Sequence, residues 1–468
     1  MTKKHFDYHS GNSAHELFQN LPLSLARRLG ARVSALARPY GLTYINEKGK
    51  TLNITLTLRP RLIHAKILKA LWHSLRILDG AFEKVGSLYH QNPRARELFP
   101  FEPRERDWIA LMRNPGYRPG RIASRWDANT TFGDREWKEG FCFFEVNGVG
   151  IGGIWYGPAC ADVSMKIIVP ELKKLDPRFS ARPTQDMRLL LLNLLLAQRK
   201  KIGRTRGAMA LIIEEACGGN FVEFERLAHL YTKMGRPTVV AEPTDVRLKG
   251  NELFAKGKKI DVVYRDTTLS EICDLQAKGH NVEALREAFR QGRMISSLEG
   301  EFDHKSVFEV FTSPRYADAF SRKERELFKR HILWTRLLRE THTTDPKGKS
   351  VDLIPFVLKN QSRLVLKPNR LFGGKGVLFG QAAKRAEWHK KIETALKERG
   401  GWVIQQLGEV RKKRFFRPQG KGVRENDLYV VSGFFATEKG LGIVGRMSER
   451  KIVNVAREGG LTPILLVK

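Results

Sequence analysis

Cysteine is scarce in this chain, and no apolar run is long enough to cross a membrane. The 468 residues include four cysteines, far apart and without CxxC spacing, which argues against a zinc cluster or a disulfide framework and favours a reducing cytoplasm. The run LLLLNLLLA falls short of the roughly 18 residues that a membrane span needs, so we expect a buried helix there. The first residues lack the apolar core of a signal peptide. We therefore predict a cytoplasmic protein without membrane contact.

Acidic residues are few beside the basic ones. The chain has 50 Asp and Glu against 83 Lys and Arg, a formal net charge of +33. A positive field of this size attracts polyanions, which means RNA, DNA, or an acidic substrate beside ATP. The basic residues are spread along the chain, and no helix-turn-helix, KH or RRM signature accompanies them. Nucleic-acid binding is therefore an alternative that we do not favour, and a charge that serves only solubility is another.

The pattern of apolar residues divides the chain into four parts. Residues 1–118 have the three- and four-residue apolar spacing of a helical region. Residues 119–204 begin with two strands and end in a helix. Residues 205–300 alternate strands such as AMALII and KKIDVVYRD with helices, which predicts a parallel, Rossmann-like layer, although no GxGxxG follows its first strand. Residues 301–468 are mixed, so the predicted fold class combines α+β and α/β.

The stretch LVLKPNRLFGGKGVLFG joins two predicted strands through a glycine-rich turn. Gly373, Gly374 and Gly376 permit positive φ and a close approach to a ligand, and their N–H groups can point at phosphate oxygens. Lys367 and Lys375 supply positive charge. The turn is not a Walker A loop, because Lys375 is not followed by Ser or Thr and the turn leads into a strand. The alternative is a hairpin with solvent-exposed lysines.

Oxygen ligands for the Mg²⁺ that accompanies phosphates lie upstream of this turn. The stretch FCFFEVNGVG places Glu145 and Asn147 two residues apart on a strand, so both side chains face the same side. SRWDAN places Asp127, with Arg125 on the same face, on the strand before it. A hairpin of these strands would bring Asp127 beside Glu145 and supply three oxygen ligands. The alternative is an exposed acidic hairpin, which fits poorly with a carboxylate inside an apolar strand.

These motifs, in this order, resemble the circularly permuted ATP-grasp ligases. RWD followed by EVN resembles their metal-binding strands, and KPN followed by GGKGV resembles their phosphate-covering loop. IDVVYRD resembles a stretch of the substrate domain, WVIQQL the strand that meets adenine, and GRMS followed by NVAREGG the closing segment. Most ATP-grasp enzymes have the lysine loop before ExN, whereas here it comes after, as in eukaryotic-type glutathione synthase and glutathionylspermidine-synthase-like proteins. The resemblance covers about residues 120–468.

The resemblance implies a circularly permuted ATP-grasp fold, with a Rossmann-like substrate subdomain and an N-terminal helical region, that uses ATP and Mg²⁺. Such a ligase activates a carboxylate as an acyl phosphate for attack by an amine. Its partners would be a small-molecule or peptide carboxylate and an amine, and a homodimer is left open. The resemblance implies metal ligands at Asp127, Glu145 and Asn147, catalytic arginines at Arg125, Arg265 and Arg446, and ATP contacts at Lys305, Lys367, Asn369, Gly373, Gly374, Lys375, Gly376, Gln405, Gln406 and Leu407.

Two departures from the family bear on the product. Glutathione synthases have a serine-containing run after ExN, where this chain reads GVGIGG. They also have a glutamate a few residues after the loop lysine, where this chain reads Asn369, Arg370 and Leu371. We therefore do not expect glutathione as the product. Two other functions stay open, namely an ATP-dependent phosphotransferase with the same fold and a basic nucleic-acid-binding protein without turnover.

Overall fold

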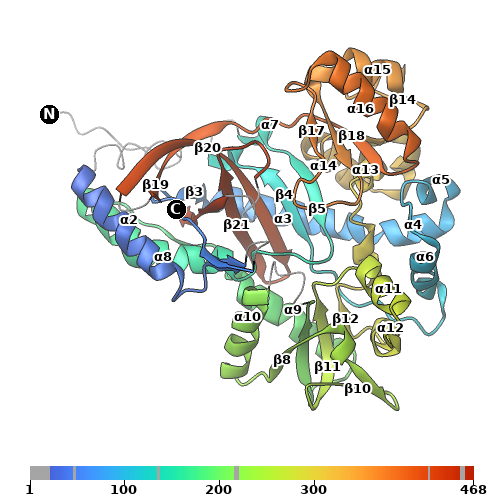
Figure 1. Ribbon diagram of the computed structural model, residues 1–468, viewed down its shortest axis with the longest axis horizontal. Helices are drawn as coiled ribbons and strands as arrows, with labels where there is room; N and C mark the ends of the chain where they lie inside the picture. Colours follow the sequence, from blue (N-terminus) through green and yellow to red (C-terminus); the bar gives the residue numbers. More distant parts are fainter. Residues whose placement is uncertain are drawn as a thin grey trace.

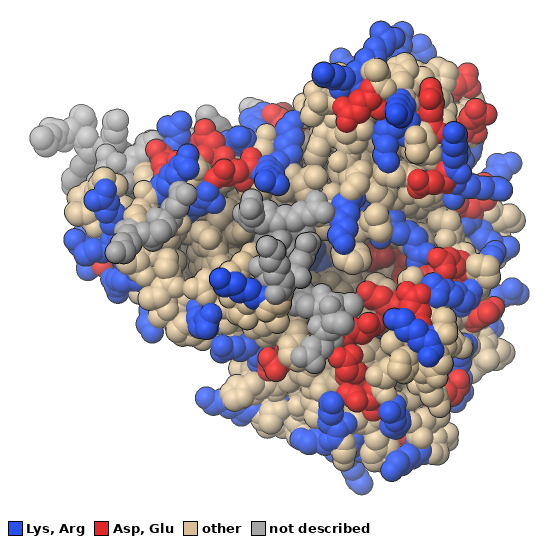
Figure 2. Space-filling model, in the orientation of Figure 1, with Lys and Arg blue, Asp and Glu red and all other residues tan. Residues whose placement is uncertain are grey.

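The computed structural model describes residues 22–45, 49–133, 137–214, 221–419, 422–453 and 459–467. Cys217 and residues 454–458 of the segment NVAREGG lie outside these ranges. The described chain combines α-helices with several β-sheets, as the predicted mixture of α and β requires (Figure 1). Lys and Arg side chains are scattered over the face of the molecule that Figure 2 shows.

The sheet at the centre of the molecule takes its strands from two distant parts of the sequence (Figure 1). Its order is β22-β21-β20-β4-β5, and β19 pairs with β20; all of these pairs are antiparallel. Because β20 pairs with β4, the predicted parts 119–204 and 301–468 share one sheet. The strands are β4 (Arg125–Asn129), β5 (Phe143–Asn147), β19 (Lys412–Gln419), β20 (Gly422–Thr437), β21 (Gly440–Ser448) and β22 (Gly460–Thr462).

Strands β4 and β5 form the hairpin that the sequence predicts. Asp127 lies opposite Glu145, and Arg125 lies opposite Asn147. Alternate residues of a strand point to the same face, so these four polar side chains share one side of the sheet. The predicted approach of Asp127 to Glu145 is therefore confirmed. The connection between the strands contains η2 (Thr131–Gly133) and α7 (Trp137–Gly140).

A second antiparallel sheet, of order β13-β18-β16-β17, adjoins β5. The Leu333 N–H donates to Phe143 O at 3.3 Å and so links the two sheets. Leu366 pairs with Leu378 across β16 and β17, so the glycine-rich turn closes a hairpin, as predicted. The elements are β13 (Thr335–Leu337), β14 (His342–Thr344), β15 (Ser350–Asp352), α15 (Leu353–Lys359), η7 (Gln361–Arg363), β16 (Leu364–Pro368), β17 (Leu378–Phe379), α16 (Arg385–Lys397) and β18 (Trp402–Gln406).

The parallel layer predicted for residues 205–300 consists of β8, β7, β11 and β12, and β10 and β9 add an antiparallel hairpin to its edge. The apolar run LLLLNLLLA lies in helix α9. The elements are α9 (Met187–Lys201), β7 (Ala208–Ile212), α10 (Phe221–Lys233), β8 (Thr238–Ala241), η4 (Pro243–Asp245), β9 (Arg247–Lys249), β10 (Glu252–Ala255), β11 (Lys258–Arg265), α11 (Leu269–Ala277), α12 (Glu283–Arg290) and β12 (Met294–Ile295).

The described part of residues 1–118 contains strands as well as the predicted helices. Strand β3 pairs in parallel with β23, close to the other end of the sequence, and β23 also pairs with β6. All four residues of β23 are buried, as are Leu62 and Ile63 of β3, so the pair lies in the interior. The elements are α2 (Leu23–Ala37), β1 (Thr43–Ile45), β2 (Thr51–Asn53), β3 (Arg61–His64), α3 (Ala65–Glu83), α4 (Val85–Gln91), α5 (Pro93–Arg96), α6 (Pro103–Ile109), η1 (Ala110–Arg113), β6 (Arg182–Pro183) and β23 (Ile464–Val467).

The remaining helices cover the central sheet and join it to the other layers. Helix α8 begins shortly after β5 and packs against α2. Among the described residues, no helix is both long enough and apolar enough to cross a bilayer. The elements are α8 (Tyr156–Leu175), η5 (Leu298–Phe302), α13 (Val307–Thr312), η6 (Pro314–Ala319) and α14 (Arg322–His331).

The packing behind β4 centres on Trp126, whose side chain points away from the polar face. Trp126 is fully buried, and its ring contacts Phe82 of α3, Phe143 of β5 and two phenylalanines of α13. Its indole N–H donates to Asp79 Oδ1 at 2.9 Å. The tryptophan therefore fixes the position of the strand that carries Arg125 and Asp127.

We expect Trp126→Ala to lower the free energy of unfolding by about 3–5 kcal/mol, because it removes a buried aromatic side chain and leaves a cavity. Chemical denaturation followed by circular dichroism measures this change. Phe372→Ala is the control, since Phe372 is 64% exposed and its loss should change stability by about 0.5 kcal/mol or less. Equal effects of the two substitutions would contradict this account of the core.

Candidate functional site

The polar cluster on β4 and β5 continues onto β21. The Arg125 guanidinium donates to both oxygens of Asp127, from Nε at 2.9 Å and from Nη2 at 3.1 Å. Arg446 of β21 approaches Asp127 Oδ2 with Nη2 at 2.8 Å, and Asn147 Nδ2 donates to the same oxygen at 3.3 Å. Only 3% of the Asp127 side chain is exposed. The carboxylate thus holds two arginines and an amide in fixed orientations.

The charge of Asp127 depends on these arginines. Burial alone would raise the pKa of Asp127, but Arg125 and Arg446 outweigh burial and lower the pKa to about 2. The carboxylate is therefore ionised at neutral pH. Its ion pairs stabilise the folded state in full at any pH above the ordinary pKa of an aspartate. This contribution is lost only as the pH falls towards about 2.

The expected role of Asp127 as a metal ligand conflicts with these contacts, because both its oxygens already accept hydrogen bonds. Within the described ranges, no group of three or more His, Cys, Asp and Glu residues could hold a metal ion. Glu145 and the amide oxygen of Asn147 fit a divalent cation of the Mg²⁺ type, which commonly takes one or two protein oxygens and completes its shell with phosphates and water. Among the described residues of this cluster, Glu145 and Asn147 are thus the predicted ligands that are best placed for the ion, while Asp127 is engaged by the arginines.

Lys305 lies where three separate segments meet. Its ammonium group is 3.0 Å from Glu145 Oε1 on β5 and donates to Leu371 O at 2.6 Å. Leu371 belongs to the segment of residues 369–377 between β16 and β17, which we call the glycine loop. The sequence-predicted lysine, metal strand and glycine loop are therefore brought together at this one ammonium group.

Lys367 extends the cluster from the second sheet. Its Nζ donates to Gln405 Oε1 of β18 at 2.6 Å and to Phe144 O of β5 at 3.4 Å. Burial, partly offset by Glu145, lowers the pKa of Lys367 to about 8. Lys367 therefore begins to lose its proton just above neutral pH, and a bound anion would stabilise the charged ammonium form.

The first two residues of the glycine loop are anchored to the protein. The Asn369 side chain accepts from Ser306 N at 2.9 Å and donates to Gly400 O at 3.1 Å. Arg370 forms a two-pronged ion pair with buried Glu105 of α6. Asn369, placed by the resemblance among the ATP contacts, is thus engaged in holding the loop, and its contact with a nucleotide stays untested.

The rest of the glycine loop is exposed or half-buried, which leaves it accessible to a ligand. Gly373, Gly374 and Gly376 have φ of 67°, 71° and 72°, a region that disfavours other residues. Lys375 is exposed beside the ring of Phe372. The backbone of this segment could therefore approach a ligand closely, with Lys375 as an additional positive charge.

The three residues predicted to line an adenine pocket lie at the end of β18. Gln405 is buried, and its amide donates to Thr335 Oγ1 at 2.9 Å. The N–H groups of Gln406 and Leu407 donate to Trp334 O and Arg363 O, both at 2.8 Å. Because both N–H groups already donate within the protein, they could contact adenine only after these hydrogen bonds break. The adenine contact of the three residues stays a prediction.

Arg265 makes all its hydrogen bonds with residues outside the polar cluster. Its fully buried guanidinium donates to the carbonyls of Ser296, Ser297 and Thr267 and forms an ion pair with Glu301. These partners join the end of β11 to η5. The structure thus gives Arg265 a bracing role, and its predicted contact with a substrate or phosphoryl group has no support in its surroundings.

Two carboxylates near the cluster were missed in the sequence. Asp303 accepts from Gly148 N at 2.7 Å, and burial, reinforced by Glu301, raises the pKa of Asp303 to about 7. Buried Glu223 accepts from the N–H groups of Gly153 and Trp155, both at 2.8 Å, and burial raises its pKa to about 7. Both hold the GVGIGG segment after β5. The position of Asp303 two residues before Lys305 was the one signal available.

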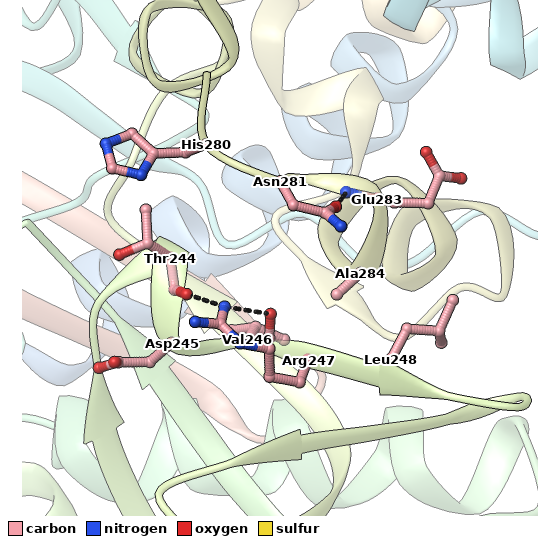
Figure 3. A pocket seen from close by; sticks show the side chains of 9 residues that line it. All are labelled: Thr244, Asp245, Val246, Arg247, Leu248, His280, Asn281, Glu283 and Ala284. Atoms are coloured by element: carbon pink, nitrogen blue, oxygen red, sulfur yellow. Dashed lines mark hydrogen bonds between the residues drawn. The ribbon is translucent and has the colours of Figure 1, made fainter. Parts of the chain in front are cut away.

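The pocket in Figure 3 is not part of this cluster. It has a volume of about 510 Å³ and lies between the segment around η4 and β9 and the start of α12. Among its lining residues, Arg247 is turned towards the carbonyl oxygens of Thr244 and Val246, and Asn281 accepts from Glu283 N (Figure 3). The side chains of Arg247 and Asn281 thus serve local hydrogen bonds, and the polar cluster around Asp127 and Lys305 is the better candidate site.

No protein-family model and no curated protein sequence matches the chain. Among solved structures, the chain is similar to a glutathione synthetase-like effector from Globodera pallida in its apo form, with a TM-score of 0.67, 12% sequence identity, and coverage of 96% of this chain and 98% of the other. The chain has the fold of that protein. A proposed gamma-glutamylcysteine synthetase from Methylobacillus flagellatus KT shares 14% identity over 81% of this chain and 85% of its own, with a TM-score of 0.36.

We expect Asp127→Asn to lower the free energy of unfolding by about 3–5 kcal/mol, because two partly buried guanidinium groups would lose their negative partner. Denaturant titration at neutral pH measures this loss. Asp427→Asn is the matched control, since Asp427 forms a half-exposed pair with Arg414 at 3.4 Å, and such pairs contribute about 0–1 kcal/mol. A loss at Asp127 as small as that of the control would show that the arginines do not depend on it.

Proposed function

We propose that this chain is an ATP- and Mg²⁺-dependent carboxylate–amine ligase of the circularly permuted ATP-grasp type. The observation that carries the proposal is the position of Lys305, whose Nζ contacts Glu145 Oε1 at 3.0 Å and Leu371 O of the glycine loop at 2.6 Å. A phosphate group held near this ammonium would lie between two carboxylate-bearing strands and a glycine-rich backbone. The fold likeness to a glutathione synthetase-like protein and the order of the motifs, with ExN before the lysine loop, agree with the proposal.

The chain's own groups supply the charge balance that phosphoryl transfer needs. Glu145 and Asn147 would hold Mg²⁺, which when bound neutralises phosphate charge and orients the triphosphate. Lys305 and Lys367 would contact phosphate oxygens, and the N–H groups of the glycine loop would cover them and exclude water. The negative charges of the site are few, so these cations favour a highly anionic ligand.

The two arginines on Asp127 are suited to the substrate carboxylate. Asp127 holds Arg125 through Nε and Nη2 and holds Arg446 through Nη2. Arg446 Nε is buried and has no hydrogen-bond partner among the described residues, which leaves a donor for a ligand. A guanidinium fixed in this way can bind a planar carboxylate, or the acyl phosphate formed from it, with two hydrogen bonds. In this proposal Asp127 positions the arginines and does not bind metal.

The test measures ADP release with pairs of carboxylates and amines. We expect ADP and phosphate only when both substrates are present, and loss of turnover in Glu145→Gln, which replaces the charged oxygen ligand by a neutral amide. Glu393→Gln, on the exposed side of α16, is the control with the same chemical change and should keep full activity. Transfer to one substrate alone with a stable phosphorylated product would indicate a phosphotransferase. No affinity for magnesium nucleotides would overturn both functions.

We also expect the affinity for magnesium ADP to fall as the pH rises through about 8, because burial lowers the pKa of Lys367 to that value and only the charged form attracts phosphate. The lysine is fully charged well below this pH and neutral well above it, so the dissociation constant should rise up to about tenfold per pH unit on the alkaline side. Calorimetric titration from about pH 7 to about pH 9.5 measures it. Lys367→Arg keeps its charge over this range and should show a flat profile.

A further inference from the structure

Helix α2 carries a charge pattern that the proposed ligase function does not use. Between Leu23 and the C-cap residue Arg38 it contains four arginines, Arg27, Arg28, Arg32 and Arg38, and no aspartate or glutamate. All four arginines are exposed. A helix of this composition concentrates one sign of charge on the surface, which differs from the mixed signs on α16.

The arginines share the side of α2 that faces solvent. The opposite side packs on the protein core through residues such as Leu29, Val33 and Ala37. At about 100° per residue the four arginines fall within an arc of about 140°, and at 1.5 Å rise they extend over about 16 Å along the helix. Ser34 and Ala35, between Arg32 and Arg38, are small and do not cover the charges. We call this surface the α2 arginine face.

Few acidic groups neutralise the α2 arginine face. Arg32 approaches Glu171 of α8 at 3.9 Å, the outer limit of an ion pair. Within the described part of the chain, Arg27, Arg28 and Arg38 form no ion pair, and Glu171 is shared with Lys174 at 3.0 Å. Positive charges so close together repel one another. Binding of an external anion would relieve this repulsion and is therefore favoured by the positive potential.

Further positive groups border both ends of this surface. Near its C-terminal end, Arg226 donates to Arg38 O, and Lys166 of α8 lies over the ring of Tyr40. Near its N-terminal end, Lys173 and Lys174 close α8. Figure 1 shows α2 and α8 side by side at the left edge of the molecule, and Lys and Arg side chains mark that edge in Figure 2. The positive surface is therefore longer than α2 itself.

We propose that the α2 arginine face docks a nucleic-acid strand by its phosphates. Arginine matches phosphate geometry with paired hydrogen bonds, and a row of exposed arginines follows a row of backbone charges. No described aromatic side chain stands among the arginines to stack a base, so the face contacts the backbone and does not distinguish sequence, nor RNA from DNA. This inference is independent of the proposed ligase function, because the residues lie outside the polar cluster.

A membrane surface fits this helix less well than a nucleic acid. A membrane-binding amphipathic helix inserts its apolar side into the lipid, but the apolar side of α2 is buried against the protein. Leu23 and Leu175 are the exposed large apolar residues that the structure describes on α2 and α8, and each lies at a helix end. The surface thus offers charge without an inserting group.

The test compares two variants that lose four exposed positive charges each. One replaces Arg27, Arg28, Arg32 and Arg38 by glutamine. The control replaces Lys384, Arg385, Lys390 and Lys397 by glutamine. These exposed residues lie at and along α16, at the upper right of Figure 1 and far from α2. Fluorescence anisotropy measures binding of labelled single-stranded RNA and DNA oligonucleotides of one sequence over a range of salt concentrations.

The α2 variant should bind both oligonucleotides much more weakly, and the slope of log affinity against log salt should drop by about 3, which is about 0.7 for each lost phosphate contact. The control should keep the slope of the unaltered protein. Equal losses in both variants, or no loss in the α2 variant, would overturn the proposal. So would a selective loss of binding to anionic lipid vesicles while oligonucleotide binding persists.

An arginine-to-lysine variant of the same four positions checks that a loss does not come from damage to the helix. It keeps the charges but not the paired hydrogen bonds, so we expect the salt slope to remain and the affinity to fall several-fold. The melting temperature and magnesium-ADP binding of all variants should equal those of the unaltered protein. A lysine variant with as low a slope as the glutamine variant would contradict phosphate docking.

Discussion

The buried carboxylate of Asp127 is the interaction on which the candidate site depends. It holds guanidinium groups from two strands, and burying these charges would cost several kcal/mol if any partner were missing. Gly433 on β20 makes room for them, since a Cβ there would lie 2.6 Å from Arg125 Cδ and 3.0 Å from Asp127 Oδ1. The absence of a side chain on β20 thus leaves room for the ion pairs that Asp127 of β4 makes with Arg125 of the same strand and with Arg446 of β21.

The site is assembled from segments that no local pattern joins. Glu145 comes from β5, Lys305 from the segment before α13, and Lys367 from the second sheet. Lys305 Nζ nevertheless lies 3.0 Å from Glu145 Oε1, and Lys367 Nζ donates to the carbonyl oxygen of Phe144, the residue before Glu145, at 3.4 Å. Each segment is held separately, as Asn369 shows by bonding Ser306 next to Lys305. The rigid parts bring the charges near each other, while the exposed part of the glycine loop is left to cover a ligand.

The hairpins could be predicted from the sequence, whereas several side-chain roles could not. Alternating apolar residues and glycine spacing are local, so the pairing of Asp127 with Glu145 followed from the sequence alone. The buried partners of Arg265 depend on distant segments, and with 83 basic residues the sequence gives no reason to separate it from Arg446. The same holds for Asp303, whose raised pKa comes from burial that only the folded chain creates. Local patterns therefore predicted the strands and hairpins, whereas the partners of buried side chains depend on contacts between distant segments.

The parallel pairing of β3 with β23 has a consequence for synthesis of the protein. Thr57 and Thr462, near these strands, are hydrogen-bonded at 2.8 Å although 405 residues separate them. During translation the early segment must wait for about 400 further residues before this layer can close, and Arg446 of β21, the partner of Asp127, is also made long after Asp127. Until then their strand edges are unprotected, a state in which slow, non-local pairing favours association with other chains. A fold that closes through such distant pairs is therefore more prone to misassociation during synthesis than one built from neighbouring segments.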